Sequence, residues 1–202
     1  KEVAMPTAEM LRTFVAVPLS QPLHAGLARA QHDLQRLCPV GAVRWVKTEG
    51  IHLTLFFLGE TPSARVADIE RVLTPVAQAA QPLQFTVGGV GAFPNLTRPN
   101  VIWVGVRDTA GTLTPLHRAV NAALASLGFQ PEDRAFTPHL TLGRVNRDSG
   151  SDVARQVGEA IGRFTLESLG EESPRQLVLF RSELRPTGAE YTALRVFPLG
   201  QG

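Results

Sequence analysis

The sequence predicts an α+β fold of two pseudo-symmetric lobes, each an antiparallel sheet with helices outside it, with a cleft between the lobes. The main observation is a repeat: His-Leu-Thr-Leu occurs at residues 52–55 and again at 139–142. Each copy leads through a polar loop to a helical pattern and then to a Phe-Thr-aliphatic segment, at 84–87 and 163–166. The 202 residues are 44% hydrophobic, which is enough for one core. We expect the two repeats to form the two lobes, related by an approximate two-fold axis.

Local patterns define the elements of the first half. Apolar runs predict strands, and apolar spacings of three and four predict helices. These patterns predict a strand at 13–17, a helix at 22–37, strands at 43–46 and 51–58, a helix at 63–80, and strands at 83–87 and 101–106. Ser63 is the expected cap of the second helix, and Pro75 is expected to kink or shorten it. Val101–Val106 is apolar on both faces, so we expect a central strand.

The second half repeats this order. It predicts a helix at 113–127 ended by Gly128, a polar loop at 131–137, a strand at 139–142, a helix from Ser151 or Asp152 to Ile161, and strands at 163–166, 177–184 and 191–197. The turn Arg185–Gly188 closes a final hairpin. Residues 1–10 read as a poorly ordered or tag-derived lead-in, with Met5 or Met10 as the natural start. Residues 11–202 are expected to form a single two-lobed domain.

Composition excludes several classes of protein. The formal net charge is only +2 and no Lys/Arg block is present, so a nucleic acid would be bound in a local cleft and not along a broad basic surface. The chain has a single cysteine, Cys38, which excludes an internal disulfide framework. We expect Cys38 to be a core residue. A single free thiol also fits a reducing cytoplasm, where we expect this chain. No apolar run reaches the roughly 20 residues of a membrane span. We expect a cytoplasmic monomer.

The two motifs predict acid–base chemistry at a phosphate. Strand side chains alternate, so His52 and Thr54 share one face, and His139 and Thr141 share one face of theirs. Of two imidazoles, one can accept a proton while the other donates one. The remaining histidines and Cys38 show neither metal-ligand spacing nor a nucleophile's partner base, so we expect no metal and no cofactor.

With both motifs considered, the chain resembles the two-histidine (2H) phosphoesterase superfamily. It is most similar to the RNA 2′,3′-cyclic phosphodiesterase branch, historically called 2′-5′ RNA ligase or LigT. The similarity runs from about residue 11 to residue 199. A single His-x-Thr-x motif is a weak signal, whereas an ordered set of segments is a strong one. The set comprises Arg12–Pro18, Arg44–Val46, Ile51–Gly59, Gly91–Pro94, Val101–Val106, Phe136–Arg144, and Ser182–Leu184 with Gly188, Tyr191 and Leu194.

The resemblance implies hydrolysis of a ribose 2′,3′-cyclic phosphate to a 2′-phosphomonoester without a metal. It implies His139 as the proton acceptor that activates water and His52 as the proton donor to O3′. Thr54 and Thr141 would hold the non-bridging oxygens. The pseudo-symmetry leaves the reverse assignment of the two histidines open. The implied partner is RNA with a 2′,3′-cyclic phosphate end, or a nucleoside 2′,3′-cyclic phosphate.

Two other functions remain open at this point. The same site run backwards would join tRNA halves through a 2′-5′ bond without ATP. A nucleotide-binding module without turnover is the other, although intact histidines and threonines in both motifs argue against it.

Four residues are candidate substrate contacts. The resemblance puts Arg144 near the phosphate, although simple counting places it on neither strand face. Phe56, counted onto the His52 face, either stacks on a base or fills the core, and Phe93 has the same two roles open to it. Tyr191 is expected to line the groove. Secondary candidates are Trp45 in the groove, Trp103 in the core, and Arg134 and Lys47 as RNA contacts or solvated side chains.

Overall fold

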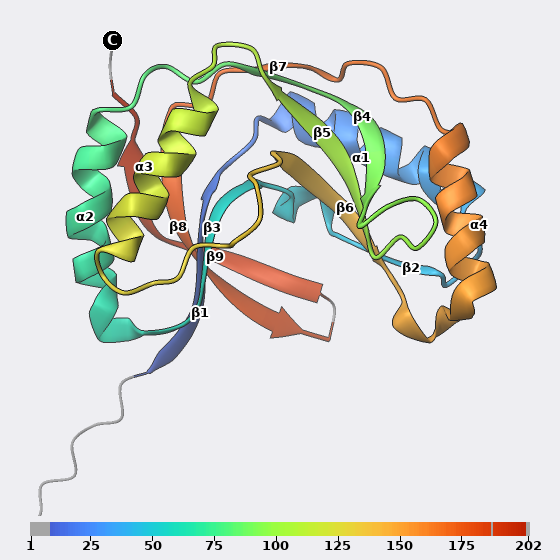
Figure 1. Cartoon of the computed structure of the whole chain (residues 1–202), viewed down its shortest axis with the longest axis horizontal. Helices are drawn as coiled ribbons and strands as arrows, with labels where there is room; N and C mark the ends of the chain where they lie inside the picture. The colour runs from blue at the N-terminus through green and yellow to red at the C-terminus, as the bar shows by residue number, and fades with distance from the viewer. Residues whose placement is uncertain (1–8, 187, 201–202) are drawn as a thin grey trace, which may run out of the picture.

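A computed structural model describes residues 9–186 and 188–200 and has an α+β fold with two antiparallel sheets (Figure 1). In chain order the elements are β1 (Met10–Val17), α1 (Gln21–Leu37), β2 (Val43–Trp45), β3 (Leu53–Pro62), α2 (Val66–Gln78), β4 (Phe85–Phe93), β5 (Val101–Asp108), α3 (Leu113–Ala125), β6 (His139–Val145), α4 (Gly150–Arg163), β7 (Gly170–Glu172), β8 (Gln176–Arg185) and β9 (Gly188–Pro198). No helix among the described residues is long and apolar enough to cross a membrane.

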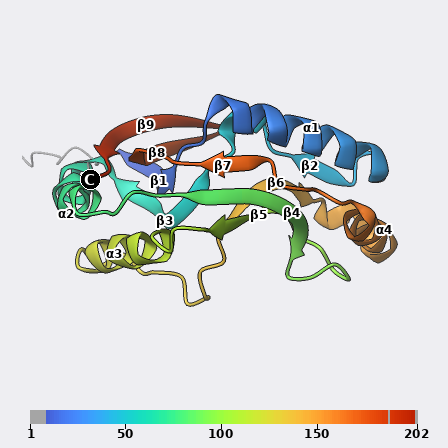
Figure 2. The same cartoon turned by 90° about the horizontal axis from the view of Figure 1, so that it is seen from above.

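The two sheets form two lobes. The four-stranded sheet has the order β3-β1-β8-β9, and the five-stranded sheet has the order β2-β6-β5-β4-β7. Helices α2 and α3 pack against each other beside the four-stranded sheet, while α1 and α4 flank the five-stranded sheet (Figures 1 and 2). Strand β5 is central in its sheet, as its apolar sequence predicts.

The lobes exchange elements between the two halves of the chain. Strands β4 and β5 belong to the first half, but β5 pairs with β6 of the second half, and β8 belongs to the second half but pairs with β1. The helices cross in the same way: the Gln31 amide of α1 donates to carbonyls of Val46 and Leu142 beside β2 and β6, while α3 contacts β3. The expectation that each repeat forms its own lobe is therefore wrong, because each sheet contains strands from both halves of the chain.

Most predicted elements are present, with three corrections. Strand β3 continues through Gly59 to Pro62, although the sequence predicts a break there, because Leu11–Thr13 of β1 pairs with this segment. Residues 164–166 form no strand; the segment instead runs beside β4, where the Leu166 carbonyl accepts from Gly89 N–H. The second helix begins as a short 3₁₀ turn at Ser63 without a side-chain cap, and Pro75 lies within α2.

The ends of the described chain also differ from expectation. Met10 already belongs to β1, opposite Pro62, and the Glu9 carboxylate lies 3.2 Å from Arg181. The rest of the predicted lead-in, residues 1–8, lies outside the described residues. A short strand that sequence reasoning missed, β7, is tied to the start of α1: its buried Glu172 accepts hydrogen bonds from the backbone and hydroxyl of Ser20, the α1 N-cap.

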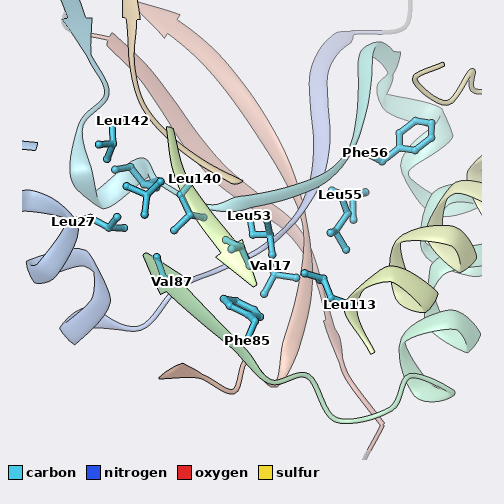
Figure 3. Close-up of a cluster of buried hydrophobic side chains, with 14 of the residues drawn as sticks. Val17, Leu27, Leu53, Leu55, Phe56, Phe85, Val87, Leu113, Leu140 and Leu142 are labelled. Atoms are coloured by element: carbon cyan, nitrogen blue, oxygen red, sulfur yellow. The ribbon is translucent and has the colours of Figure 1, made fainter. Parts of the chain in front are cut away.

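One buried cluster connects the two lobes. Leu53 and Leu140, which follow the two motif histidines, lie in it together with Val17, Phe85 and α1 side chains (Figure 3). Each such fully buried side chain contributes about 1.5–3 kcal/mol. Cys38 is buried too, as expected of a core thiol, and burial raises its pKa to about 11.

Candidate active site

The two motif strands bury one face and present the other. Leu53 and Leu140 are fully buried in the common core. Because side chains alternate along a strand, His52, Thr54, His139 and Thr141 point away from that core, and all four are partly exposed. Strands β3 and β6 also approach each other. Both His-x-Thr pairs therefore lie on the faces of β3 and β6 that point away from the shared core.

Both imidazoles are held in the same way. His52 Nδ1 lies 2.7 Å from the Gly50 carbonyl, and His139 Nδ1 lies 2.8 Å from the Thr137 carbonyl, in each case two residues back along the chain. A carbonyl oxygen only accepts, so Nδ1 carries the proton in both rings. Each neutral imidazole therefore has its basic nitrogen at Nε2, on the side of the ring away from the backbone.

His52 sits in an aromatic cage. Its ring stacks on Phe14 at 4.5 Å between centroids and meets the edge of Tyr191 at 5.0 Å, with Phe180 at 6.0 Å. Burial by these rings lowers the pKa of His52 to about 4, against the opposing effect of the Gly50 hydrogen bond. The free side chain is therefore neutral at pH 7, with Nε2 unprotonated.

Different aromatic side chains surround His139. The Phe93 ring meets it edge-on at 4.9 Å and lies 5.3 Å from the Trp103 ring. Trp103 lies over Gly91, where a Cβ would overlap its ring. Phe93, a predicted stacking residue, is thus placed beside the second histidine and is partly exposed.

A β-bulge changes which aromatic residue reaches the His52 face. Val15 pairs with Phe56 and Ala16 with Thr54, so Leu55 is an extra residue in β3. Leu55 and Phe56 both turn into the core, and Phe56 is only 4% exposed. The prediction of Phe56 as a stacking residue is wrong for this reason. Phe57, which is 54% exposed, takes the cleft face instead, 6.1 Å from Phe14.

The same bulge recurs in β6. Trp103 pairs with Thr141 and Ile102 with Gly143, so Leu142 is the extra residue there. Arg144 consequently returns to the Thr141 face and is exposed, although simple counting put it on neither face. Phe57 and Arg144 thus occupy equivalent positions, five residues after their histidines. The uninterrupted apolar pair at Leu55–Phe56 and the glycine at 143 are the sequence signals that could have shown these bulges.

Tyr191 lies beside His52, where charges from both lobes act on its hydroxyl. Burial raises the pKa of its hydroxyl, and the charges of Arg12 and Arg144 act against that rise. Arg144 lies in the five-stranded sheet and Tyr191 in the four-stranded one, so Tyr191 is influenced by a charge from the other lobe. A Cβ at Gly50 would lie 3.0 Å from the Tyr191 ring, so the residue whose carbonyl anchors His52 also makes room for Tyr191.

Comparison with known proteins identifies the family. A model of the 2′-5′ RNA ligase superfamily matches residues 20–170. The chain belongs to the 2′-5′ RNA ligase superfamily. Among its relatives in the superfamily is the RNA 2′,3′-cyclic phosphodiesterase of Archaeoglobus fulgidus, 38% identical over 93% of this chain and 99% of the relative. The protein of the same name from Methanothermobacter thermautotrophicus is 33% identical over 94% of this chain and 99% of the relative.

Solved structures agree with the superfamily fold. The protein TT0787 of Thermus thermophilus superposes with a TM-score of 0.77 at 28% identity, over 95% of this chain and 100% of that protein. Escherichia coli LigT, solved with 3′-AMP, has a TM-score of 0.73 at 24% identity, over 96% of this chain and 100% of LigT. The two-lobed α+β fold predicted from the sequence is confirmed.

The structure also places the secondary candidates and the remaining histidines. Trp45 and Trp103 are partly buried, and Arg134 is exposed in its loop. Lys47 is exposed, and its Cε would lie 3.7 Å from a Cβ at Gly188. His24 and His32 lie in α1, and His117 of α3 stacks on Phe136 at 3.8 Å. Within the part of the chain that the structure describes, no three His, Cys, Asp or Glu side chains cluster as metal ligands.

Proposed function

We propose that this chain is an RNA 2′,3′-cyclic phosphodiesterase that hydrolyses a terminal 2′,3′-cyclic phosphate to a 2′-phosphomonoester by paired-histidine acid–base catalysis, without a metal. The observation that carries the proposal is the matched pair of anchored imidazoles, each with a threonine two residues further along the same strand face. Relatives across nearly the whole chain bear the name of that activity. We take residues 11–202 as one catalytic unit, since the buried cluster draws on both lobes.

The reaction needs one proton removed and one supplied. His139 Nε2 accepts a proton from water as the water oxygen bonds to phosphorus. The P–O3′ bond breaks, and His52 donates a proton to the departing O3′. The phosphate stays on O2′, so the product is the 2′-phosphomonoester. Acid–base catalysis of this kind contributes roughly 10²–10⁴-fold in rate.

Charge on the phosphoryl oxygens also needs stabilisation. Thr54 and Thr141 carry hydroxyls on the faces of their histidines, and each can donate to a non-bridging oxygen. Arg144 adds a permanent positive charge from the same strand as His139, for a charge-assisted hydrogen bond. Phe57, in the equivalent position on β3, offers an exposed ring on which the terminal base can stack, and Phe93 and Tyr191 line the two histidines.

His52 must be protonated to act as the donor, whereas burial keeps the free side chain neutral at pH 7. The bound phosphodiester supplies the missing stabilisation, because an anion next to an imidazole favours the charged form. A donor with a low intrinsic pKa then releases its proton readily to O3′. If the substrate does not raise the pKa of His52, the two histidines exchange roles.

The test is an assay with a short RNA ending in 2′,3′-cyclic phosphate, in the presence of a chelator, with the terminus identified by ³¹P NMR. We expect a 2′-phosphate product. His52→Gln and His139→Gln are each expected to lose about 10²–10⁴-fold in kcat. His32→Gln, an exposed α1 residue, is the matched control. Absence of product, or full activity in either motif variant, would end the proposal.

A further inference from the structure

A groove lies on the five-stranded sheet, over β4 and β5. It has a volume of about 440 Å³ and is lined by Thr86, Val87, Gly88, Gly89, Gly105, Val106, Arg107, Leu166 and Ser168. Gly105 of β5 pairs directly with His139 of β6, and Gly88 of β4 pairs with Gly105 on the other side. The groove therefore begins one strand away from the second catalytic histidine, on the same face of the sheet.

Close packing explains why two of the positions that line the groove are glycine. A Cβ at Gly105 would lie 2.9 Å from the Gly88 carbonyl, and one at Gly88 would lie 3.1 Å from the Glu167 carbonyl. Side chains are too crowded at both positions. Both positions therefore require glycine, and main-chain atoms line this part of the groove.

One positive charge borders this groove. Arg107 lies two residues beyond Gly105 on β5, so it shares the face of Gly105 and His139, about 6.6 Å further along the strand. It is exposed and makes no ion pair with the described residues. Its neighbour Asp108 accepts the backbone N–H groups of Thr112, Leu113 and Thr114 at the start of α3.

Thr86, directly opposite Arg107 on β4, adds a hydroxyl to the groove. Glu171 follows on β7, beyond Thr86. No ion pair joins Glu171 to Arg107 among the described residues, so the guanidinium remains available to a ligand.

A second concavity, on the four-stranded sheet, has a different charge pattern. Its lining includes Arg12, Glu60, Arg181 and Glu183, two charges of each sign. Arg181 is already engaged, at 3.2 Å from Glu9 and 3.3 Å from Glu183. The opposite charges on this surface compensate each other, so it attracts a polyanion less strongly than the groove at Arg107 does.

We propose that the groove beside Gly105 holds the part of the RNA that precedes the terminal nucleotide, with Arg107 and the Thr86 hydroxyl binding the first upstream phosphodiester. This inference rests on the proposed function. The terminal nucleotide carries its cyclic phosphate on O2′ and O3′ and joins the rest of the strand through O5′. A nucleoside 2′,3′-cyclic phosphate lacks that linkage, so Arg107 contributes only when a second nucleotide is present.

Substrate length therefore tests the subsite. In the full chain we expect kcat/KM to be higher for a dinucleotide or hexanucleotide ending in 2′,3′-cyclic phosphate than for the mononucleotide. Arg107→Ala is expected to lower kcat/KM about five- to tenfold for the oligonucleotides and to leave the mononucleotide unchanged. Thr86→Val is expected to act in the same direction with a smaller effect. Arg181→Ala, in the opposite concavity, is the matched control and is expected to change neither.

Binding provides a readout that does not depend on turnover. For a labelled hexanucleotide with a 3′-phosphate end, Arg107→Ala is expected to weaken binding and to reduce the slope of log affinity against log salt by about 0.7, the value for one phosphate contact in a single strand. Equal losses for mononucleotide and oligonucleotide, an unchanged salt slope, or an effect of Arg181→Ala in place of Arg107→Ala would each overturn the subsite. If no cyclic phosphate is hydrolysed, the proposed function fails, while the binding measurement still decides the subsite.

Discussion

Replacing His52 by glutamine is expected to weaken the dependence of the free energy of unfolding on pH in the acidic range. In the folded chain, burial against Phe14 and Tyr191 lowers the pKa of His52 to about 4, whereas a histidine in the unfolded chain titrates at about 6.5. Between these values the unfolded chain binds the proton and the folded chain does not. The free energy of unfolding therefore falls as the pH falls.

The sign and size follow from these two pKa values. The contribution of neutral His52 is fully present above pH 6.5 and is lost as the pH falls towards 4. At pH 4.5 the loss amounts to about 2–3 kcal/mol. Glutamine fills similar space but does not titrate, so the stability gap between wild type and His52→Gln should narrow by that amount from pH 7.5 to pH 4.5.

Urea unfolding at four pH values between 7.5 and 4.5 measures this difference, with His32→Gln as a control for an exposed histidine. If the wild-type and His52→Gln curves run parallel, His52 titrates alike in the folded and unfolded chains, and the reasoning from burial is refuted. A gap that widens at low pH would mean that the folded chain raises the pKa of His52.

The same histidine can be followed by NMR with inorganic phosphate present. If the anion binds next to Nε2, the pKa of His52 should rise from about 4, by at least one pH unit. An unchanged value in saturating phosphate would leave the proton-donor role to His139 and assign the base to His52.

Four further results are expected. Phe57→Ala should raise KM for oligonucleotides several-fold and leave the thermal midpoint of unfolding unchanged, since the ring is 54% exposed. Phe56→Ala, one residue earlier and 4% exposed, should instead lower the free energy of unfolding by about 3–5 kcal/mol, measured in urea. Thr54→Val and Thr141→Val should each lower kcat about 10- to 100-fold with little change in KM. Activity should be the same after dialysis against a chelator as after addition of zinc or magnesium.

Each of these has an outcome that contradicts it. Equal loss of stability in the two phenylalanine variants would argue against the bulge at Leu55. A threonine variant that raises KM at unchanged kcat would assign that hydroxyl to ground-state binding and not to the transition state. Loss of activity in chelator, restored by one metal, would show that the imidazole pair needs an ion.

The sequence alone led to the chemistry that we propose for the site. The repeated His-Leu-Thr-Leu, with its alternation, named both imidazoles and both hydroxyls, and apolar periodicity located nearly every helix and strand. These features depend on residues close together in the chain, so they can be predicted without knowledge of the fold.

Tertiary structure decided which side chains accompany those four residues. Whether Phe56 or Phe57 reaches the cleft depends on how β3 pairs with β1, and the position of Arg144 depends on how β6 pairs with β5. The exchange of β4 and β8 between lobes and the glycine-floored groove at Arg107 likewise come from contacts between distant segments. A bulge reverses the alternation beyond it, and pairing with a distant strand sets its position, so counting along one strand cannot locate it.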